Sequence, residues 1–280
     1  MLSISIKDDC ISCGKCVTVC PVDIFKMTSR EENKKSSKVE VVNASTCIDC
    51  SHCVCVCPVE AIDHSCFPQG SLRDVEYTKY PSPEQVLELI EGRRSNRAFT
   101  KEPIEMERLV LLKRAALKAP TASNSRKIDC MIITEPEKLA AVTRFTVKKF
   151  HSLAKFFSLP VIRYISGLFV EEHVLHTALK MNENLENGKD DILRGATSLI
   201  LFYSTENTHF KVEDANLAYQ NASLLAESMH LSHFYTGFVC AAVRLDRQKT
   251  LQKLLGIKGE IFAGMALGNQ KFPMLRTRAK

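Results

Sequence analysis

Between residues 82 and 231, apolar residues recur with helical periodicity in several segments. Ser82 forms an N-cap, a proline follows it at the first helical position, and the apolar stripe behind them predicts a helix to about Gly92. The same periodicity predicts a helix over 104–117, which ends before Pro120. A short apolar run over 130–134 then predicts a strand.

A further helical pattern runs from Ala215 to Met229 and is distinguished by its small residues. Its alanines lie three or four residues apart, so they share one face that lets another helix approach closely. A helix that is apolar over so much of its circumference is predicted to be buried on most sides. The small face comprises Ala215, Ala218, Ala222 and Ala226, and the adjoining apolar arc comprises Leu217, Leu224, Leu225 and Met229.

Composition divides the chain into two domains. Residues 66–83 are rich in proline and polar side chains, which is typical of a surface linker, so we predict one domain over 1–65 and another over 84–280. Hydrophobic residues make up 45% and charged residues 25%, which is ordinary for a soluble globular protein. No signal peptide is predicted, and charges and a proline interrupt the longest apolar stretch, 153–170, so no membrane span is expected.

Eight of the twelve cysteines fall into two copies of one spacing, Cys-x-x-Cys-x-x-Cys-x-x-x-Cys-Pro. Three thiols at such intervals let one loop reach three corners of an iron-sulfur cubane. The fourth, before the proline, is carried by a short helix to the other cluster. We therefore assign Cys10, Cys13, Cys16 and Cys57 to one [4Fe-4S] cluster, and Cys47, Cys50, Cys53 and Cys20 to a second.

Zinc and disulfides are the alternatives for a cysteine-rich segment. Zinc takes four ligands in two Cys-x-x-Cys pairs, whereas each copy here supplies a third evenly spaced cysteine and a Cys-Pro. Disulfides belong to oxidising compartments, which a signal peptide usually announces. Iron-sulfur clusters are therefore favoured. The other four cysteines are predicted to be ordinary thiols: Cys55, Cys66, Cys130 and Cys240.

The segment from Cys10 to about Ile62 resembles the bacterial two-cluster ferredoxins, with the ligand spacing intact in both halves. Beyond the ligands, residues 21–23 (Pro-Val-Asp) are echoed by residues 58–60 (Pro-Val-Glu), so the two halves repeat one folding unit. The chain departs from that family in a charged run over 30–38, which we predict to be an exposed hairpin loop.

Three arginines and a serine fall within five positions where the first helix of the second domain ends. Arginine donates planar, bidentate hydrogen bonds to phosphate, and a serine hydroxyl completes such a cradle, although a surface charge cluster has the same composition. Further along, a polar turn over 120–126 contains an asparagine that offers a donor and an acceptor to a heterocycle edge. The candidates are Arg93, Arg94, Ser95, Arg97 and Asn124.

Together these stretches resemble the FMN-dependent nitroreductase family. Its Arg-x-Ser-x-Arg-x-Phe element matches residues 93–99, and its Pro-Ser-x-x-Asn element corresponds to residues 120–124. The resemblance covers about residues 84–280, and with the cluster domain it makes the chain similar to a ferredoxin-nitroreductase fusion. Further matches follow in order: the strand 199–202 behind Gly195, the long helix 214–231, the turn 235–238, the strand 261–268 and the basic segment 275–278.

The resemblance implies an α+β fold, with a central, mostly antiparallel sheet flanked by helices, in a homodimer that binds FMN between its subunits. Residues 143–187, variable in the family, are predicted to be helices that cover the flavin pocket. His230 and His233 stand where the family often has Gly-Leu-Gly, and we interpret them as capping or packing residues rather than substrate contacts.

The resemblance also implies roles for the candidate residues. Arg93, Arg97, Arg276 and Arg278 would neutralise the FMN phosphate, and Arg94, Ser95 and Asn124 would contact ribityl or ring atoms. The turn with Thr236 and Gly237 would face the flavin ring, with the Gly237 amide near N5. No catalytic side chain is expected, since reduced flavin itself supplies the hydride.

Charge gives little reason to expect nucleic-acid binding. The formal charge of +6 falls to roughly +2 once two clusters of about −2 each are counted, and few aromatic residues accompany the basic runs. We expect a cytoplasmic FMN-dependent oxidoreductase that receives single electrons through two [4Fe-4S] clusters, from reduced ferredoxin or NAD(P)H. Its small-molecule electron acceptor is expected to be a nitro compound, a quinone or a similar electrophile. The alternatives are another flavin reduction, such as dehalogenation or alkene reduction, and an electron carrier that serves a protein partner.

Overall fold

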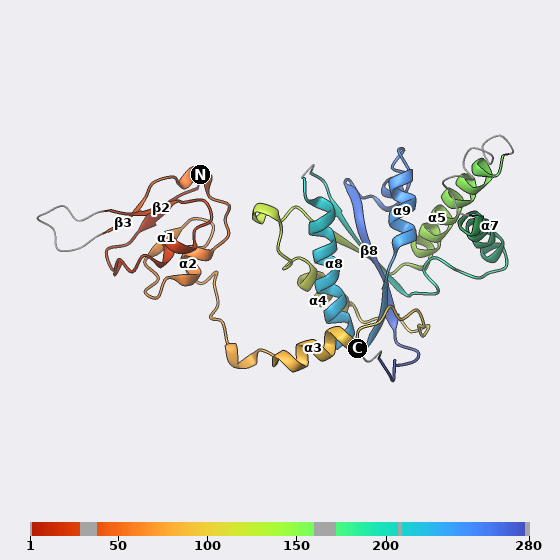
Figure 1. The fold of residues 1–280 in the computed structure, drawn as a ribbon, viewed down its shortest axis with the longest axis horizontal. Helices are drawn as coiled ribbons and strands as arrows, with labels where there is room; N and C mark the ends of the chain where they lie inside the picture. Colours follow the sequence, from red (N-terminus) through yellow and green to blue (C-terminus); the bar gives the residue numbers. More distant parts are fainter. Residues whose placement is uncertain (1, 29–37, 160–171, 207–208, 278–280) are drawn as a thin grey trace, which may run out of the picture. The chain divides into compact units, whose positions relative to one another are not determined.

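The computed structural model describes residues 2–28, 38–159, 172–206 and 209–277, and Figure 1 shows their helices and strands. Contacts group the chain into two compact units. One contains residues 1–80 and 123–125, and the other contains residues 81–122 and 126–280. Among the described helices, none combines the length and the apolar character needed to cross a membrane.

The first unit is built from two antiparallel strand pairs and two short helices. β1 (Ile4–Ile6) pairs with β4 (Ile62–His64), and β2 (Phe25–Met27) pairs with β3 (Val39–Val41). Apart from Lys38, the predicted hairpin loop between β2 and β3 lies outside the described residues. The helical segments are α1 (Lys15–Val19), η1 (Ala44–Thr46), α2 (His52–Val56) and η2 (Tyr77–Lys79).

The two halves of this unit repeat one backbone path. α1 begins at residue 15 and α2 at residue 52, which is 37 positions later, and β2 and β4 begin at residues 25 and 62. Matched loop residues share a left-handed conformation, with φ of 54° at Ser12 and 50° at Asp49. Left-handed residues other than glycine are uncommon, so their recurrence at matched positions indicates that both cysteine loops follow the same course. The shared core comprises Cys16, Ile24, Phe25, Val39, Cys53 and Ile62.

The second unit is built around a four-stranded antiparallel sheet with the strand order β5-β6-β8-β7. Four consecutive residues of β6, from Leu199 to Phe202, are 0% exposed, and alternate residues belong to two different apolar cores. Because side chains alternate across a strand, the sheet is covered on both faces. The strands are β5 (Asp129–Ile133), β6 (Ser198–Ser204), β7 (Leu231–Tyr235) and β8 (Glu260–Asn269).

Helices form a layer on each face of this sheet, which confirms the predicted α+β fold (Figure 1). α4 and α8 pack on one face, and α5, α7, α9 and α10 pack on the other. The predicted cover over 143–187 thus contains parts of α5 and α7, while its residues 160–171 lie outside the described part of the chain. The helices are α3 (Pro83–Gly92), α4 (Met106–Ala116), α5 (Pro136–Phe157), α7 (Glu172–Glu186), α8 (Lys211–Ser228), α9 (Gly237–Leu245) and α10 (Thr250–Leu255), with a short turn η3 (Ala122–Asn124).

The central helix, α8, differs from its prediction at its end. It ends at Ser228, His230 turns the chain with a left-handed φ of 54°, and Leu231 already begins β7, so the predicted extension to Leu231 was wrong. The four alanines are buried in the core that α8 shares with α4 and the sheet. Leu217 is 44% exposed, so one chain alone leaves part of this helix uncovered.

Candidate functional site

The eight candidate cysteines surround two small cavities in the first unit. Cys16 and Cys53 are buried on α1 and α2, whereas Cys20 and Cys57 end those helices and line the cavity of the opposite half. Each short helix therefore links the two cavities. Cys10, Cys13, Cys16 and Cys57 line one cavity, and Cys20, Cys47, Cys50 and Cys53 line the other.

The chemistry of these donors fits a four-iron cluster in each cavity. Burial raises the pKa of Cys53 to about 11 and also raises the pKa values of Cys16 and Cys47, so iron binding displaces protons from these thiols. Backbone N–H groups point at the sulfurs, as where Ala61 donates to Cys57 Sγ at 3.2 Å. At the matched position Ile24 donates to Cys20 Sγ at 3.4 Å. Hydrogen bonds of this kind stabilise the negative charge that thiolate-bound clusters carry.

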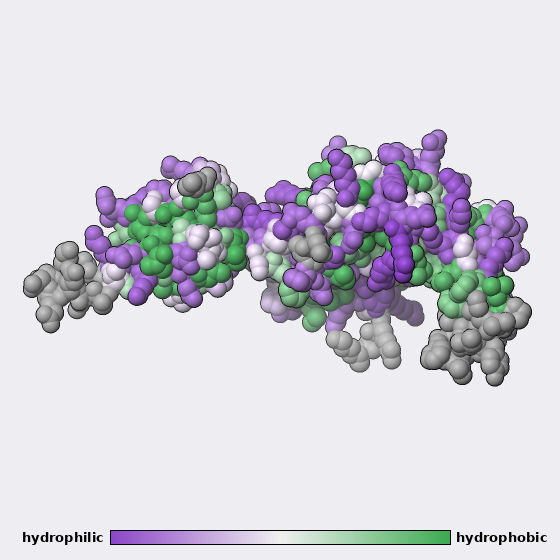
Figure 2. All heavy atoms as spheres, turned by 90° about the horizontal axis from the view of Figure 1, so that it is seen from above, coloured by the Kyte–Doolittle hydropathy of each residue, from purple (hydrophilic) through white to green (hydrophobic). Residues whose placement is uncertain are grey.

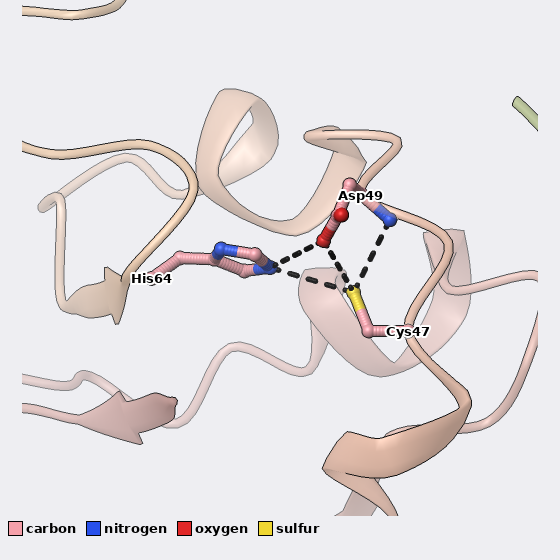
Figure 3. A group of neighbouring side chains, drawn as sticks. All are labelled: Cys47, Asp49 and His64. Carbon is pink, nitrogen blue, oxygen red and sulfur yellow. Dashed lines mark hydrogen bonds and ion pairs between the residues drawn. The ribbon is translucent and has the colours of Figure 1, made fainter. Parts of the chain in front are cut away.

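One of these cysteines, Cys47, lies beside two polar side chains that the sequence did not single out (Figure 3). Its Sγ lies 3.4 Å from His64 Nε2 and 3.6 Å from Asp49 Oδ1, and the backbone N–H of Asp49 donates to it at 3.4 Å. His64 is buried, and burial lowers its pKa despite the nearby Asp49 carboxylate, which favours the neutral imidazole. The side chain of Cys47, a candidate cluster ligand, therefore lies within hydrogen-bonding distance of the buried His64 ring.

The second unit contains a cavity of ≈ 690 Å³ beside β7 and the start of α9. Its size lies within the range of cofactor pockets, which extends over roughly 300–1,000 Å³. Three predicted flavin contacts line it together: Arg97, Thr236 and Gly237. Phe238, from the predicted turn 235–238, also lines it, and further lining residues that the sequence did not single out are Phe150, Asp191, Arg194 and Phe234.

Thr236 and Gly237 are held at the cavity by the neighbouring strand. Thr236 is the N-cap of α9, and its backbone N–H donates to Gly264 O on β8 at 2.9 Å. A Cβ atom on Gly264 would lie 2.3 Å from Thr236 Oγ1, so only glycine leaves room for this threonine. A glycine inside a strand often marks such a close approach, and that signal could have identified Gly264 from the sequence.

Arg97 lies at the cavity above an aromatic side chain. Its guanidinium carbon is 5.1 Å from the centroid of the Phe234 ring, and its Nη1 donates to Ser95 O at 2.9 Å. The side chain nevertheless remains exposed, so most of its donors face outward. Arginine, aromatic rings and the N-terminal N–H groups of α9 together fit a molecule that has both a phosphate and a planar ring system.

Asn96 fastens the arginine segment to the residues that follow β8. This buried side chain donates from Nδ2 to Phe272 O at 3.0 Å and accepts from the backbone N–H of Ala98 at 3.0 Å. Next to it, the backbone N–H of Thr100 donates to Asn269 O at 2.9 Å. Residues 93–100 therefore depend on the segment after β8, a dependence that the sequence did not reveal.

The remaining candidates are distributed as follows. Arg94 donates to Glu91 O at 2.7 Å, to Arg93 O at 2.8 Å and to Thr277 Oγ1, so it ties α3 to the segment that carries the exposed Arg276. Arg93 and Ser95 flank it, Asn124 ends η3 with a left-handed φ of 53°, and Arg278 lies outside the described residues.

The two histidines near the end of α8 have different surroundings. His233 is 0% exposed on β7, its Nε2 lies 2.8 Å from Ser223 Oγ, and its Nδ1 lies 3.1 Å from Leu231 O. It is therefore a packing residue, as predicted. His230 forms the left-handed turn between α8 and β7.

Comparisons with known proteins agree with this geometry. The chain matches the family model "Nitroreductase family" over residues 90–269 and the model "4Fe-4S dicluster domain" over residues 9–61. A comparison with curated proteins found no match. These two domain matches confirm the predicted ferredoxin-nitroreductase arrangement.

Several solved structures share the fold of the second unit. Nitroreductases with bound FMN from Bacteroides fragilis and Desulfitobacterium hafniense each give a TM-score of 0.53, at 16% and 18% identity, over 70% of this chain and 94% of theirs. An FMN-dependent nitroreductase from Clostridium difficile gives a TM-score of 0.51 at 17% identity, over 70% of this chain and 96% of its own. With the family model matching most of its length, the chain belongs to the nitroreductase family and carries a 4Fe-4S dicluster domain ahead of its nitroreductase domain.

Proposed function

We propose that this protein is an FMN-dependent oxidoreductase that receives single electrons through two [4Fe-4S] clusters and reduces a nitro compound, a quinone or a similar electrophile. The observation that carries the proposal is the combination, in one nitroreductase-family chain, of a dicluster domain and a cavity lined by arginines and aromatic rings. When bound, the clusters pass one electron at a time and the flavin supplies hydride chemistry. FMN is also the flavin named for the similar solved structures.

The chain's own residues would bind and orient the flavin rather than react. Arg93, Arg97 and the arginines of the C-terminal segment, Arg276 and Arg278, would bind the phosphate through charge-assisted hydrogen bonds. Arg94, Ser95 and Asn124 are proposed to contact ribityl or ring atoms. The backbone around Thr236 and Gly237 would face the ring, because the N-terminus of α9 opens into the cavity.

The cavity walls suggest how water and protons are handled. Phe150 and Phe238 pack edge to face with ring centroids 5.6 Å apart and would exclude water from one side. Asp191 contributes a carboxyl group to the cavity lining. Its burial acts to raise its pKa, but hydrogen bonds from Asn184 and Lys189 outweigh burial and lower it. Asp191 is therefore a carboxylate at neutral pH and accepts hydrogen bonds, so protons would come from solvent.

A homodimer is part of the proposal, because the described chain leaves apolar helix faces uncovered. None of the residues of α3 is buried, although ten-residue helices are marginal without tertiary packing. Leu87 and Ile90 of α3 are 52% and 47% exposed, and Leu217 of α8 is 44% exposed. Hydrophobic residues also reach the surface in the view of Figure 2, which is otherwise largely hydrophilic. Light scattering should report a dimer that Leu87→Glu weakens, whereas Leu254→Glu on α10 should leave it intact.

We also propose a cytoplasmic location and reduced ferredoxin or NAD(P)H as the donor. The twelve cysteines form no disulfide, as expected where thiols are kept reduced. The NAD(P)H alternative needs a hydride acceptor, whereas a ferredoxin needs only access to a cluster. Donor assays on the purified protein separate the two.

Anaerobic purification with iron, sulfide and flavin counted per chain is the first test of the proposed function. Dithionite-reduced protein is then mixed with nitroaromatics, quinones, halogenated aromatics and activated alkenes. Turnover of a nitro compound or quinone supports the proposal. Flavin reduction without turnover of any small electrophile would instead favour an electron carrier, and absence of flavin would overturn the proposed function.

A further inference from the structure

His64 marks a difference between the two halves of the cluster unit. It is the last residue of β4, and Met27 is the last residue of β2, so the two residues occupy matched positions of the repeat. Histidine carries an N–H donor, whereas methionine carries only a weakly accepting thioether. The repeat is therefore chemically unequal at a position that, in one half, touches a candidate cluster ligand.

The hydrogen bonds of the His64 ring determine which nitrogen carries its proton. The backbone N–H of Cys66 donates to Nδ1 at 3.1 Å, so Nδ1 is an acceptor and the proton of the neutral ring sits on Nε2. Nε2 lies 3.4 Å from Cys47 Sγ, within reach of an N–H···S hydrogen bond. The ring is also packed against Phe67 with centroids 4.8 Å apart and its side chain is 1% exposed, so its orientation is fixed.

Asp49 acts in the opposite direction to His64. Its carboxylate oxygen lies 3.6 Å from the same sulfur, and a negative charge there disfavours adding an electron to the cluster. The Asp49 side chain is 44% exposed, so water and salt screen its charge, whereas the His64 hydrogen bond is shielded from solvent. The hydrogen bond from His64 therefore outweighs the carboxylate.

We propose that His64 is a positioning residue that raises the reduction potential of the cluster held by Cys20, Cys47, Cys50 and Cys53, by donating from Nε2 to the Cys47 sulfur. One-electron reduction adds a negative charge that is spread over iron and sulfur, and a hydrogen-bond donor to sulfur stabilises that reduced form. The two clusters of the repeat thereby become unequal electron acceptors. The inference rests on the cluster assignment that is part of the proposed function.

The test is an anaerobic redox titration of the purified, cluster-loaded protein, followed by EPR of the reduced clusters. His64→Met introduces the residue of the matched position, and His64→Gln retains an N–H donor of similar reach. His52→Met is the matched control, because His52 on α2 lines the same cavity but makes no hydrogen bond to a cysteine sulfur among the described residues. Iron and sulfide are counted for every variant.

We expect His64→Met to lower the midpoint potential of one cluster and to leave the other unchanged, with His64→Gln closer to the wild type and His52→Met unaltered. Unchanged potentials in His64→Met at full iron content would overturn the proposal. Loss of a cluster in both His64 variants would overturn it as well, since His64 would then be a ligand or a structural support.

A measurement on the wild type requires no substitution. With 15N-labelled histidine, pulsed EPR should detect a weak nitrogen coupling typical of a hydrogen-bonded ring, and a coupling of ligand strength or none at all contradicts the proposal. No readout uses an electron acceptor, so the outcome does not depend on turnover. A wild-type protein without iron would instead refute the proposed function, and the iron count identifies that case.

Discussion

The two units of this protein differ in how far apart in the sequence the residues of each candidate site lie. In the first unit, each candidate cluster cavity takes its cysteines from one compact loop and from the end of the partner half's helix. In the second unit, the cavity is lined by Arg97 and by residues of α5, of the loop before β6 and of the β7–α9 turn. Short-range spacing therefore specifies the first site, whereas the second exists only after distant strands have paired.

The largest expected effect comes from breaking the short-range site. Cys53→Ser replaces a buried thiol by a hydroxyl, which is a poor iron ligand, so we expect the iron content to fall by about half as one of two clusters is lost. Cys55→Ser is the matched control, because Cys55 is exposed two positions away on the same helix. Iron analysis and EPR measure both variants, and equal iron loss in the two would refute the ligand assignment.

Disturbing strand packing in the second unit should have the next largest effect. Gly264→Ala would place a Cβ atom 2.3 Å from Thr236 Oγ1, so we expect a loss of about 3 kcal/mol in the free energy of unfolding, together with weaker flavin binding. Urea denaturation measures the loss. Gly92→Ala is the control, since a Cβ atom there would meet nothing within 4 Å. Similar losses for both variants would mean that the Thr236 contact does not matter.

Arg97→Gln tests one side chain of the second unit's cavity. It keeps hydrogen-bond donors but removes the charge above Phe234, so we expect FMN affinity to fall about tenfold while the clusters remain intact. Quenching of flavin fluorescence measures the affinity. Arg114→Gln, on the exposed side of α4, should bind FMN like the wild type. If the two variants behaved alike, Arg97 would not be a phosphate ligand.

The smallest expected effect concerns an ion pair that ties α5 to the start of α10. Asp246 accepts from Lys149 Nζ at 2.7 Å. Although burial acts to raise the pKa of Asp246, hydrogen bonds from Lys149 and Thr250 lower it overall. Because the folded pKa is depressed, the ionised carboxylate stabilises the fold above the unfolded pKa of about 3.9, and this contribution disappears as pH falls through the lower folded pKa.

Asp246→Asn should therefore cost about 1 kcal/mol of unfolding free energy at pH 7 and progressively less below about pH 4. Unfolding curves at several pH values measure this convergence. Glu135→Gln, which removes an exposed ion pair with Lys138, should change little at any pH. A pH-independent difference for Asp246→Asn would exclude the ionic origin of the effect.

The contrast between the units explains what the sequence could reveal. Cysteine spacing is a local property, and apolar periodicity identified β5, α3 and most of α8, so these predictions needed no knowledge of long-range pairing. The Asn96 contact with Phe272 joins residues 176 positions apart, and no periodicity signals such a pairing. Similarly, His64 becomes meaningful only when β1 and β4 pair and bring it beside Cys47.

The end of α8 was mispredicted for a related reason. Leu231 continues the apolar pattern of the helix, yet it pairs with Asn269 of β8 once His230 has turned the chain. Tertiary pairing thus overrides a local preference that is only weakly helical at this point. Similarly, the sequence of α3 does not reveal what covers its exposed residues Leu87 and Ile90, for which we propose a second subunit.

The bond between Asn96 and Phe272 has a consequence for biosynthesis. After a ribosome has added residue 96, it must add 176 more residues before the carbonyl of Phe272 exists. The cluster unit, whose strands end at His64, has all its strands available far earlier. Newly made chains should therefore acquire iron before the flavin-binding residues are complete. The direction of translation would thus set the order in which the cofactors bind.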